Sequence, residues 1–355
     1  MLEALTKQLD GRQSLTALQV REAVEALTDE QTSAEIKAGF LTALALKGET
    51  VDEIAAFALE LRDRAVPVPL DGVTRGGEIL DVCGTGGDRL NTFNISTTVA
   101  FILAAAGATV AKHGNRAITS KTGSADVLEA LGIRTDLSPK LAADWLGEHQ
   151  FAFFFAPNYH PAFKHIAPAR KLCAERGQRT IFNFLGPLLN PARPTAQLIG
   201  VPRPELCEPI ARVLQVLGVR RGMVVSGLVS PLLTSGVTNY LDELSTLGTT
   251  TVAEFYHERG FTSSSLSHEV FPLQRVALAD LAGTDRDGNA KLVIAVLEGK
   301  DRGPRRDAVL LNAAAALLVA GRAKSLDQGW SMAAEIVDDG RAAKKLAELQ
   351  QASTK

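Results

Sequence analysis

Hydrophobic residues recur at helical spacing through about the first 65 positions of the chain. Three segments begin with a capping-box pattern, in which a threonine is followed three positions later by Gln or Glu, at Thr16, Thr32 and Thr50. Behind each threonine, apolar residues three or four positions apart form one stripe. The pattern predicts a small bundle of short helices that ends before residues 66–70, where two prolines cannot continue a helix.

From residue 78 onward the pattern changes to short apolar runs separated by turns and helix-like segments. The runs that predict buried strands are residues 78–82, 108–111, 151–157, 197–201 and 223–227. Strand–turn–helix repeats of this kind predict a mostly parallel sheet covered by helices. The expected fold is therefore α/β, with a small all-helical domain beside a large domain built on that sheet. The alanine-rich segment from residue 307 is interpreted as a packing helix only.

The first predicted strand continues into a glycine-rich turn. Residues 84–88 are Gly-Thr-Gly-Gly-Asp, so the turn presents backbone rather than side chains. Residues 91–97, Asn-Thr-Phe-Asn-Ile-Ser-Thr, then place cap-type side chains before an apolar helix, where free N–H groups favour an anion. The turn has neither a Walker Gly-Lys-Ser/Thr ending nor GxGxxG spacing, so by itself it is also compatible with a plain tight turn.

A second polar loop follows the next predicted strand. Residues 112–116 are Lys-His-Gly-Asn-Arg, and residues 119–126 are Thr-Ser-Lys-Thr-Gly-Ser-Ala-Asp. Parallel strands bring the ends of neighbouring strands to one edge of the sheet. The two loops together predict one pocket for a polyanion at that edge, lined by amides, hydroxyls and cations.

Composition restricts the classes of partner. With 38 Lys and Arg against 40 Asp and Glu, the net charge of −2 provides no global positive field for nucleic acid or an anionic membrane. The three cysteines form no CxxC pair, which favours free thiols in a reducing compartment. The first residues lack a secretory pattern, and the apolar windows are shorter than the roughly 20 residues that span a bilayer. We expect a cytoplasmic protein that binds neither nucleic acid nor membrane.

These motifs, in this order, resemble the anthranilate phosphoribosyltransferase family. The resemblance covers nearly the whole chain and rests on residues 84–88, 94–97, 112–116, 123–132, 179–188, 190–191, 197–201 and 307–316. It implies transfer of a 5-phosphoribosyl group from phosphoribosyl pyrophosphate (PRPP) to the amine of anthranilate, with release of pyrophosphate, in tryptophan biosynthesis. It also implies a Mg²⁺ cofactor and a homodimer formed through the helical domain.

The resemblance further implies how the domains are divided. The small domain would comprise residues 1–68 joined by about 158–180, and the large phosphoribosyl-binding domain would comprise residues 72–157 and 181–355. The cleft would then lie between the two parts, where small-molecule sites tend to form.

The resemblance assigns the donor site and the metal ligands. The residues expected to bind PRPP are Gly84, Gly87, Asp88, Thr92, Asn94, Ile95, Ser96, Thr97, Lys112, His113, Gly114, Asn115, Arg116, Ser120 and Ser124. Asp242 and Glu243 are the expected Mg²⁺ ligands, because hard carboxylate oxygens beside a diphosphate hold this ion, and Ser96 would add a hydroxyl. Other acidic pairs occur at 29–30, 52–53 and 338–339, so only the resemblance selects this one.

The acceptor site is carried over in the same way. The residues expected to contact anthranilate are Gly84, His113, Asn115, Arg170 and Pro187. Arg170 would bind the carboxylate at two points. The transition state should resemble an oxocarbenium ion, so Lys112, Asn115 and Arg170 would act by electrostatics and positioning, without a covalent intermediate. His113 and His160 would shape the pocket or relay a proton.

The chain departs from the family pattern between residues 227 and 241. Leu228 to Tyr240 form a longer, mostly uncharged segment, with Ser226 where the family often has histidine. Thr119 and Thr122 stand where serine is more usual. These differences keep a phosphoribosyltransferase for another aromatic amine as an alternative. A pyrimidine nucleoside phosphorylase of the same fold and a non-catalytic relative that binds nucleic acid are the others, although the acidic pair and the charge balance disfavour them.

Overall fold

A bundle of helices forms the amino-terminal part of the computed structural model, which describes residues 1–117, 121–230, 239–257 and 260–354. The helices are α1 (Leu2–Asp10), α2 (Ala17–Thr28), α3 (Ala34–Lys47) and α4 (Val51–Asp63). Thr16 and Thr50 form the predicted capping boxes of α2 and α4. The prediction at Thr32 was wrong. Ser33 caps α3, because the Thr32 hydroxyl donates to the Asp29 carboxylate at 3.0 Å.

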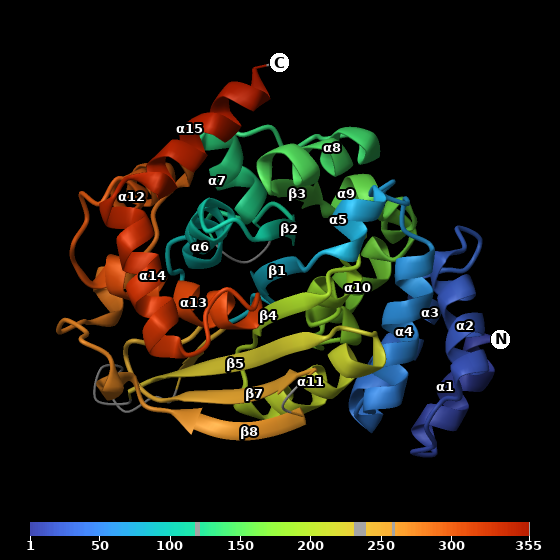
Figure 1. Ribbon diagram of the computed structural model, residues 1–355. Coiled ribbons are helices and arrows are strands. Elements are labelled where there is room, and N and C mark those ends of the chain that lie inside the picture. The colour runs from blue at the N-terminus through green and yellow to red at the C-terminus, as the bar shows by residue number, and fades with distance from the viewer. Residues whose placement is uncertain (118–120, 231–238, 258–259, 355) are drawn as a thin grey trace.

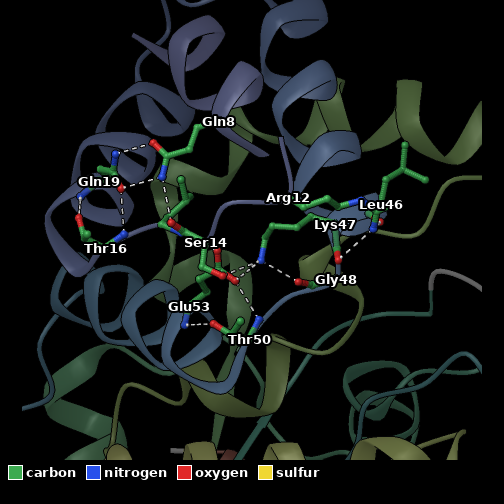
Figure 2. Close-up of polar contacts among 11 residues, drawn as sticks. Gln8, Arg12, Ser14, Thr16, Gln19, Leu46, Lys47, Gly48, Thr50 and Glu53 are labelled. Atoms are coloured by element: carbon green, nitrogen blue, oxygen red, sulfur yellow. Dashed lines mark hydrogen bonds and ion pairs between the residues drawn. The ribbon is translucent and has the colours of Figure 1, made fainter. Parts of the chain in front are cut away.

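Glu53 connects three parts of this bundle (Figure 2). Its buried carboxylate accepts hydrogen bonds from the backbone N–H groups of Leu15 at 2.9 Å and Thr50 at 2.8 Å. It also pairs with Nζ of Lys47 at 2.7 Å. A buried carboxylate destabilises a protein unless it is paired, so these contacts hold the turn between α3 and α4 against the segment that precedes α2.

The chain returns to the bundle after the sheet has begun. The 3-10 turn η1 (Pro161–His165) packs on α2, and α10 (Ala167–Glu175) packs on α3. The buried Lys37 of α3 donates from Nζ to the carbonyls of Asp29 at 2.6 Å and His165 at 2.9 Å. The segment that carries Arg170 is therefore fixed to the amino-terminal helices.

The described residues form one eight-stranded sheet with the order β3-β2-β1-β4-β5-β7-β8, and β6 pairs with β5. The strands are β1 (Ile79–Gly84), β2 (Thr109–Gly114), β3 (Phe151–Phe155), β4 (Ala196–Gly200), β5 (Arg221–Val229), β6 (Asn239–Leu241), β7 (Thr250–Tyr256) and β8 (Gly260–Leu266). Neighbours from β3 to β5 are parallel, whereas β6, β7 and β8 pair antiparallel. The predicted α/β fold, with a small helical bundle and a mostly parallel sheet, is confirmed.

Successive residues of a strand face two different hydrophobic cores, as strand geometry requires. On β5, Met223 and Val225 belong to the core that contains α6 (Ile95–Ala105) and α13 (Pro304–Val319). Val224 belongs to the core that contains α11 (Cys207–Val216) and continues into α1–α4. The bundle therefore shares a core with one face of the sheet, and Figure 1 shows α12–α15 on the side away from the bundle.

The remaining helical segments are short connections or coverings of the sheet. They are α5 (Gly72–Gly76), α7 (Ser124–Ala130), α8 (Pro139–His149), α9 (Ala156–Tyr159), α12 (Arg286–Leu297), α14 (Leu326–Asp338), α15 (Arg341–Ser353), η2 (Ile181–Asn183), η3 (Gly186–Leu189), η4 (Pro204–Leu206), η6 (His268–Val270) and η7 (Leu278–Leu281). None of the helices formed by the described residues has the length and apolar character needed to cross a membrane. The three cysteines are unpaired, as predicted.

Candidate active site

The glycine-rich turn after β1 lies at the carboxyl edge of the sheet and leads to the start of α6. Gly86 and Gly87 have φ values of 73° and 86°, and Arg89 and Asn91 also have left-handed φ values, of 61° and 52°. Such values are strained for most residues, so the turn holds an unusual backbone shape. It ends at a helix whose first N–H groups have no partner within the helix.

Asn94 precedes α6, but its side chain does not cap that helix. Its Nδ2 donates to the carbonyl of Thr122 at 3.3 Å, and its Oδ1 accepts from Nδ2 of Asn289 at 2.9 Å. Asn289 is a buried residue of α12, and its own Oδ1 accepts from the N–H of Thr284 at 2.7 Å. The start of α6 is thus tied to the loop after β2 and to α12. The Asn94 side chain does not occupy the first-turn N–H groups, of which that of Ile95 donates to the Phe93 carbonyl at 2.7 Å.

Asp242 approaches the glycine-rich turn from a loop that is distant in sequence. The N–H of Gly86 donates to Oδ2 of Asp242 at 2.7 Å. A Cβ atom at Gly84 would overlap the Asp242 carboxylate, and one at Gly200 would overlap its backbone carbonyl. The two glycines therefore let the acidic loop lie directly against the ends of β1 and β4.

Strand pairing fixes where this acidic loop begins. Leu228 of β5 lies opposite Tyr240 of β6, so the segment that departs from the family pattern leaves the sheet and returns to it as paired strands. Residues 231–238, between these strands, lie outside the described residues. The acidic pair follows β6 directly, and its position is set by the sheet.

The electrostatics of the acidic loop favour a bound cation. Burial, followed by the charge of the neighbouring Asp88, raises the pKa of Asp242 to about 8. Burial, followed by the Asp242 charge, raises the pKa of Glu243 well above its usual range. Burial also raises the pKa of Asp88, which neighbours Asp242. A divalent cation would stabilise the ionised forms of these carboxylates.

Magnesium fits this set of donors. Within the described part of the chain, no three His, Cys, Asp or Glu side chains converge as the ligands of one metal ion would. Mg²⁺ prefers hard oxygen ligands and is usually held by one or two carboxylates together with substrate phosphates and water. Asp242 and Glu243 would hold the ion in this way only with a phosphate present.

Lys112 lies beneath the start of α6 and is almost fully buried. Its Nζ donates to the carbonyl of Val82 at 2.7 Å and to Oγ of Ser96 at 3.3 Å. The backbone N–H of Ser96 lies near the Glu243 carboxylate and favours its ionised form, which lowers the pKa of Glu243. Burial lowers the pKa of Lys112, and the nearby Cys83, Asp81 and Glu243 oppose that change. Ser96 thus stands between a buried cation and the acidic pair, as a metal-side hydroxyl should.

The loop after β2 is tied to the start of α7. Arg116 binds the Glu129 carboxylate at 2.7 and 2.8 Å and also contacts Asp126. Asp126 accepts hydrogen bonds from the N–H groups of Ala117 and Gly123, both at 2.9 Å. The Arg116 guanidinium is therefore engaged with α7, and its backbone N–H donates to Oδ1 of Asn115 at 2.8 Å. The predicted donor Ser120 lies outside the described residues.

A row of aromatic rings leads from the end of β2 to α10. His113 and His160 are buried, with ring centroids 5.3 Å apart, and His160 stacks on Phe163 at 5.2 Å. Phe163 meets Phe182 edge-on at 5.7 Å, and the Arg170 guanidinium lies over the Phe182 ring at 5.4 Å. No carboxylate among the described residues pairs with Arg170, so this cation is available to an acidic ligand.

Both histidines of this row are neutral. Burial, followed by the proximity of His160, lowers the pKa of His113 to about 3, and burial lowers the pKa of His160 to about 4. Nδ1 of His113 contacts the carbonyl of Gly186 at 3.2 Å. The buried Nε2 atoms of both rings have no hydrogen-bond partner among the described residues. A ligand with a polar group beside an aromatic ring would satisfy them.

The two halves of the site lie on opposite faces of β2. Lys112 reaches Ser96 of α6, whereas His113 reaches Gly186 of η3, because neighbouring strand residues point to opposite faces. The buried Asp81 of β1 supports this strand end, since its carboxylate accepts from the His113 N–H at 3.4 Å and from Nδ2 of Asn190 at 2.9 Å. Burial raises the pKa of Asp81 to about 6.

Known proteins are similar to this chain along nearly its whole length. Residues 2–65 match the family described as "Glycosyl transferase family, helical bundle domain", and residues 76–343 match "Glycosyl transferase family, a/b domain". The anthranilate phosphoribosyltransferase of Geobacter sulfurreducens is 47% identical over 328 residues, which cover 90% of this chain and 89% of that protein. The enzyme of the same name from Petrotoga mobilis is 44% identical over 337 residues, or 95% and 92% of the two chains.

This chain belongs to the anthranilate phosphoribosyltransferase family.

Solved structures of anthranilate phosphoribosyltransferases have the same fold. The Thermus thermophilus enzyme superposes with a TM-score of 0.87 at 38% identity, over 99% of both chains. The Saccharomyces cerevisiae enzyme in complex with PRPP and Mg superposes with a TM-score of 0.85 at 27% identity, over 99% of this chain and 98% of that one. The same yeast enzyme in complex with 4-fluoroanthranilate gives a TM-score of 0.83 at 26% identity, with coverage of 99% and 98%.

Most of the residues assigned from the anthranilate phosphoribosyltransferase motifs surround one edge of the sheet. The glycine-rich turn, the start of α6, Lys112 and the acidic pair are joined by the hydrogen bonds given above. Ile95 and Thr97 are both buried. The Ile95 N–H donates to the Phe93 carbonyl at 2.7 Å, so of these two residues Thr97 would offer a ligand its backbone N–H. Ser124 donates from Oγ to the carbonyl of Asn115 at 3.3 Å, which keeps both beside the second loop.

Sequence reasoning missed several residues around the site. Asn289 is one isolated amide in a helical pattern, and no local signal connects it with Asn94. Phe163 and Phe182 lie beside Arg170, the expected acceptor residue, although the sequence pattern is typical of ordinary core residues at both positions. The resemblance through residues 179–188 marks the region of Phe182 without indicating its contact with Arg170.

Proposed function

We propose that this protein transfers the 5-phosphoribosyl group of PRPP to the amine of anthranilate, giving N-(5-phosphoribosyl)anthranilate and pyrophosphate, in tryptophan biosynthesis. The observation that carries this proposal is the arrangement of β2, whose end places Lys112 beside the acidic pair and His113 beside the aromatic row. An anionic donor and an aromatic acceptor would then meet across the end of one strand. The curated relatives are named for this reaction, and the alternatives from the sequence are not favoured.

On the donor side, the chain's own groups would bind the diphosphate. The Thr97 N–H at the start of α6 and N–H groups of the glycine-rich turn would donate to phosphate oxygens, and Lys112 would neutralise charge. Asp242, Glu243 and Ser96 would hold Mg²⁺, which neutralises charge on the departing pyrophosphate. The yeast relative's complex with PRPP and Mg supports this cofactor.

On the acceptor side, positioning would do most of the work. Arg170 would bind the anthranilate carboxylate, Asn115 and Gly84 would border the ring and amine, and Pro187 would bound the pocket. An aryl amine is neutral at pH 7, so it needs orientation toward the anomeric carbon more than a strong base. The neutral His113 and His160 fit this requirement, because they bring no charge that would repel the oxocarbenium-like transition state.

The division of the chain and its assembly belong to the same proposal. The small domain would comprise residues 1–68 with about 158–180, and the large domain residues 72–157 and 181–355. Leu18 and Leu46, both 63% exposed, support a homodimer formed through the helical bundle, because a second copy would cover such side chains. The unpaired cysteines support a cytoplasmic location.

The test is the loss of anthranilate fluorescence when purified protein is mixed with PRPP and Mg²⁺. Omission of each component in turn provides the controls. A decay that needs all three components is the expected result. A stable signal from protein that still binds PRPP would instead point to a different aromatic amine as acceptor.

A further inference from the structure

A buried amide of α13 holds the backbone of the acidic loop. The Leu244 N–H donates to Oδ1 of Asn312 at 2.9 Å, and Nδ2 of Asn312 donates back to the Leu244 carbonyl at 3.1 Å. The same Nδ2 donates to the carbonyl of Ala308, one turn earlier in α13, at 2.9 Å. Asn312 has no exposed surface, and its amide oxygen and nitrogen are both engaged.

Asn312 pairs with Leu244 much as a residue of a neighbouring strand would, because its side-chain amide bonds both the backbone N–H and the backbone carbonyl of Leu244. The N–H that donates to Asn312 belongs to the peptide bond between Glu243 and Leu244. Asn312 therefore fixes the orientation of the peptide that carries the Glu243 side chain. The third bond, to Ala308, holds the amide in one rotamer, so the loop cannot slide without breaking buried hydrogen bonds.

The opposite side of the loop is held by the sheet. Leu241 and Thr250 both lie opposite Gly227, so the ends of the loop meet at one residue of β5. Ser245 donates its backbone N–H to Oγ1 of Thr250 at 3.0 Å and its hydroxyl to the Leu228 carbonyl at 2.7 Å. The sheet thus fixes the ends and the far half of the loop, whereas Asn312 fixes the half beside the acidic pair.

A held backbone is needed here because the loop concentrates like charges. Asp88, Asp242 and Glu243 lie close together and are half-buried, and their ionised forms repel one another. A loop free to move would relieve that repulsion by turning its carboxylates toward solvent. Outer contacts of this kind orient metal ligands, and their loss typically weakens metal binding by about 10–100-fold.

We propose that Asn312 is a positioning residue for the metal–diphosphate site, and that it acts by holding the Glu243–Leu244 peptide so that the acidic pair faces Ser96 and the glycine-rich turn. This inference rests on the proposed function. It gives the alanine-rich helix α13 a role in binding the donor in addition to its packing role.

The test compares Asn312→Leu, which keeps the side-chain volume, with the native protein. Isothermal titration calorimetry with PRPP at a series of Mg²⁺ concentrations measures donor binding directly, without turnover. The variant should bind Mg²⁺ with PRPP about 10–100-fold more weakly. Its KM for anthranilate, measured at saturating donor and metal, should change by less than about twofold.

Two further variants separate positioning from simple stability. Glu53→Gln removes a buried charge pair in the helical bundle, far along the chain from the acidic loop, so it should lower the melting temperature and leave Mg²⁺-dependent binding unchanged (Figure 2). Asn312→Ser leaves room for water to hydrogen-bond Leu244, so it should fold if the leucine variant does not, and should weaken donor binding in the same sense.

Native Mg²⁺-dependent binding in a folded Asn312 variant would overturn the proposal, as would an equal loss in Glu53→Gln. An equal fall in anthranilate affinity would also overturn it, because the effect would then be general. Native protein that binds no PRPP with Mg²⁺ would contradict the proposed function itself, so the two failures are distinguishable.

Discussion

The Gly86 backbone N–H donates to the Asp242 carboxylate at 2.7 Å, although 156 positions separate the two residues. This bond joins the glycine-rich turn, which would bind the donor phosphates, to the acidic loop, which would bind the metal. Neither part forms the donor site alone. The relationship also explains why glycines stand at positions 84 and 200, because side chains there would displace Asp242.

Removal of both acidic side chains should abolish turnover while the fold is retained. In the double variant Asp242→Asn, Glu243→Gln, the amides keep the shape of the loop but cannot stabilise Mg²⁺ beside pyrophosphate. We expect turnover to fall by at least about 100-fold, with an unchanged circular dichroism spectrum. Activity near the native level with native Mg²⁺ dependence would show that the metal is held elsewhere.

The stability of the metal-free protein should depend on pH through Asp242. Burial raises the pKa of Asp242 to about 8, so the folded state keeps a proton that the unfolded chain releases near its ordinary pKa of 3.8. The stabilising effect is therefore complete below about pH 4 and is lost as pH rises through about 8. The melting temperature of the native protein minus that of Asp242→Asn should fall across this range. A melting-temperature difference that does not change with pH would contradict the raised pKa of Asp242.

Loss of the Arg170 guanidinium should affect the acceptor selectively. A charged hydrogen-bonding pair contributes about 1.5–3 kcal/mol, so Arg170→Ala should raise the KM for anthranilate roughly 10–100-fold and leave the KM for PRPP nearly unchanged. Lys171→Ala is the matched control, because that neighbouring cation of α10 is exposed. If Arg170→Ala weakened PRPP alone, the donor and acceptor sides would have been interchanged.

Anthranilate binding should be insensitive to pH between about 6 and 8. Burial lowers the pKa of His113 to about 3 and that of His160 to about 4, so both rings stay neutral throughout this range. A lowered histidine pKa means that stability present above about pH 6.5 is lost as pH falls toward 4. The KM for anthranilate measured across pH 6–8 checks this. An inflection near 6.5 that disappears in His160→Gln would contradict it.

Asn289 should support the donor site through Asn94. Its Nδ2 bonds Oδ1 of Asn94 at 2.9 Å, so Asn289→Ala removes the group that orients this amide. A hydrogen bond contributes about 0.5–1.5 kcal/mol, which predicts a roughly 2–10-fold higher KM for PRPP. The KM for anthranilate provides the internal control. Equal increases in both constants would indicate a general structural effect instead.

Local patterns predicted the elements around the site because each has a local cause. The glycine-rich turn follows an apolar strand, and the capping boxes at Thr16 and Thr50 are formed by residues three positions apart. The predicted capping box at Thr32 does not form for a reason that is also short-range, because the Asp29 carboxylate accepts the hydrogen bond of the Thr32 hydroxyl. Only the family resemblance identifies Asp242 and Glu243 as the metal ligands, because their spacing does not distinguish them from the other acidic pairs.

The rest of the site depends on contacts between distant segments. Asn289 and Asn312 each occupy one position in a helical pattern, and their partners lie 195 and 68 positions away. The aromatic row likewise joins residues from β2, η1 and η2. A single sequence carries no periodic signal for such contacts, so the pattern of α13 predicts only a packing helix and not the bond between Asn312 and Leu244.

The proposed transfer couples release of pyrophosphate to consumption of anthranilate, so the stoichiometry of the reaction tests it most directly. Pyrophosphate release and anthranilate consumption are measured together in the presence of PRPP and Mg²⁺. We expect one pyrophosphate for each anthranilate consumed, and negligible release when anthranilate is omitted. Pyrophosphate release at the same rate without anthranilate, with the anthranilate left unchanged, would contradict it.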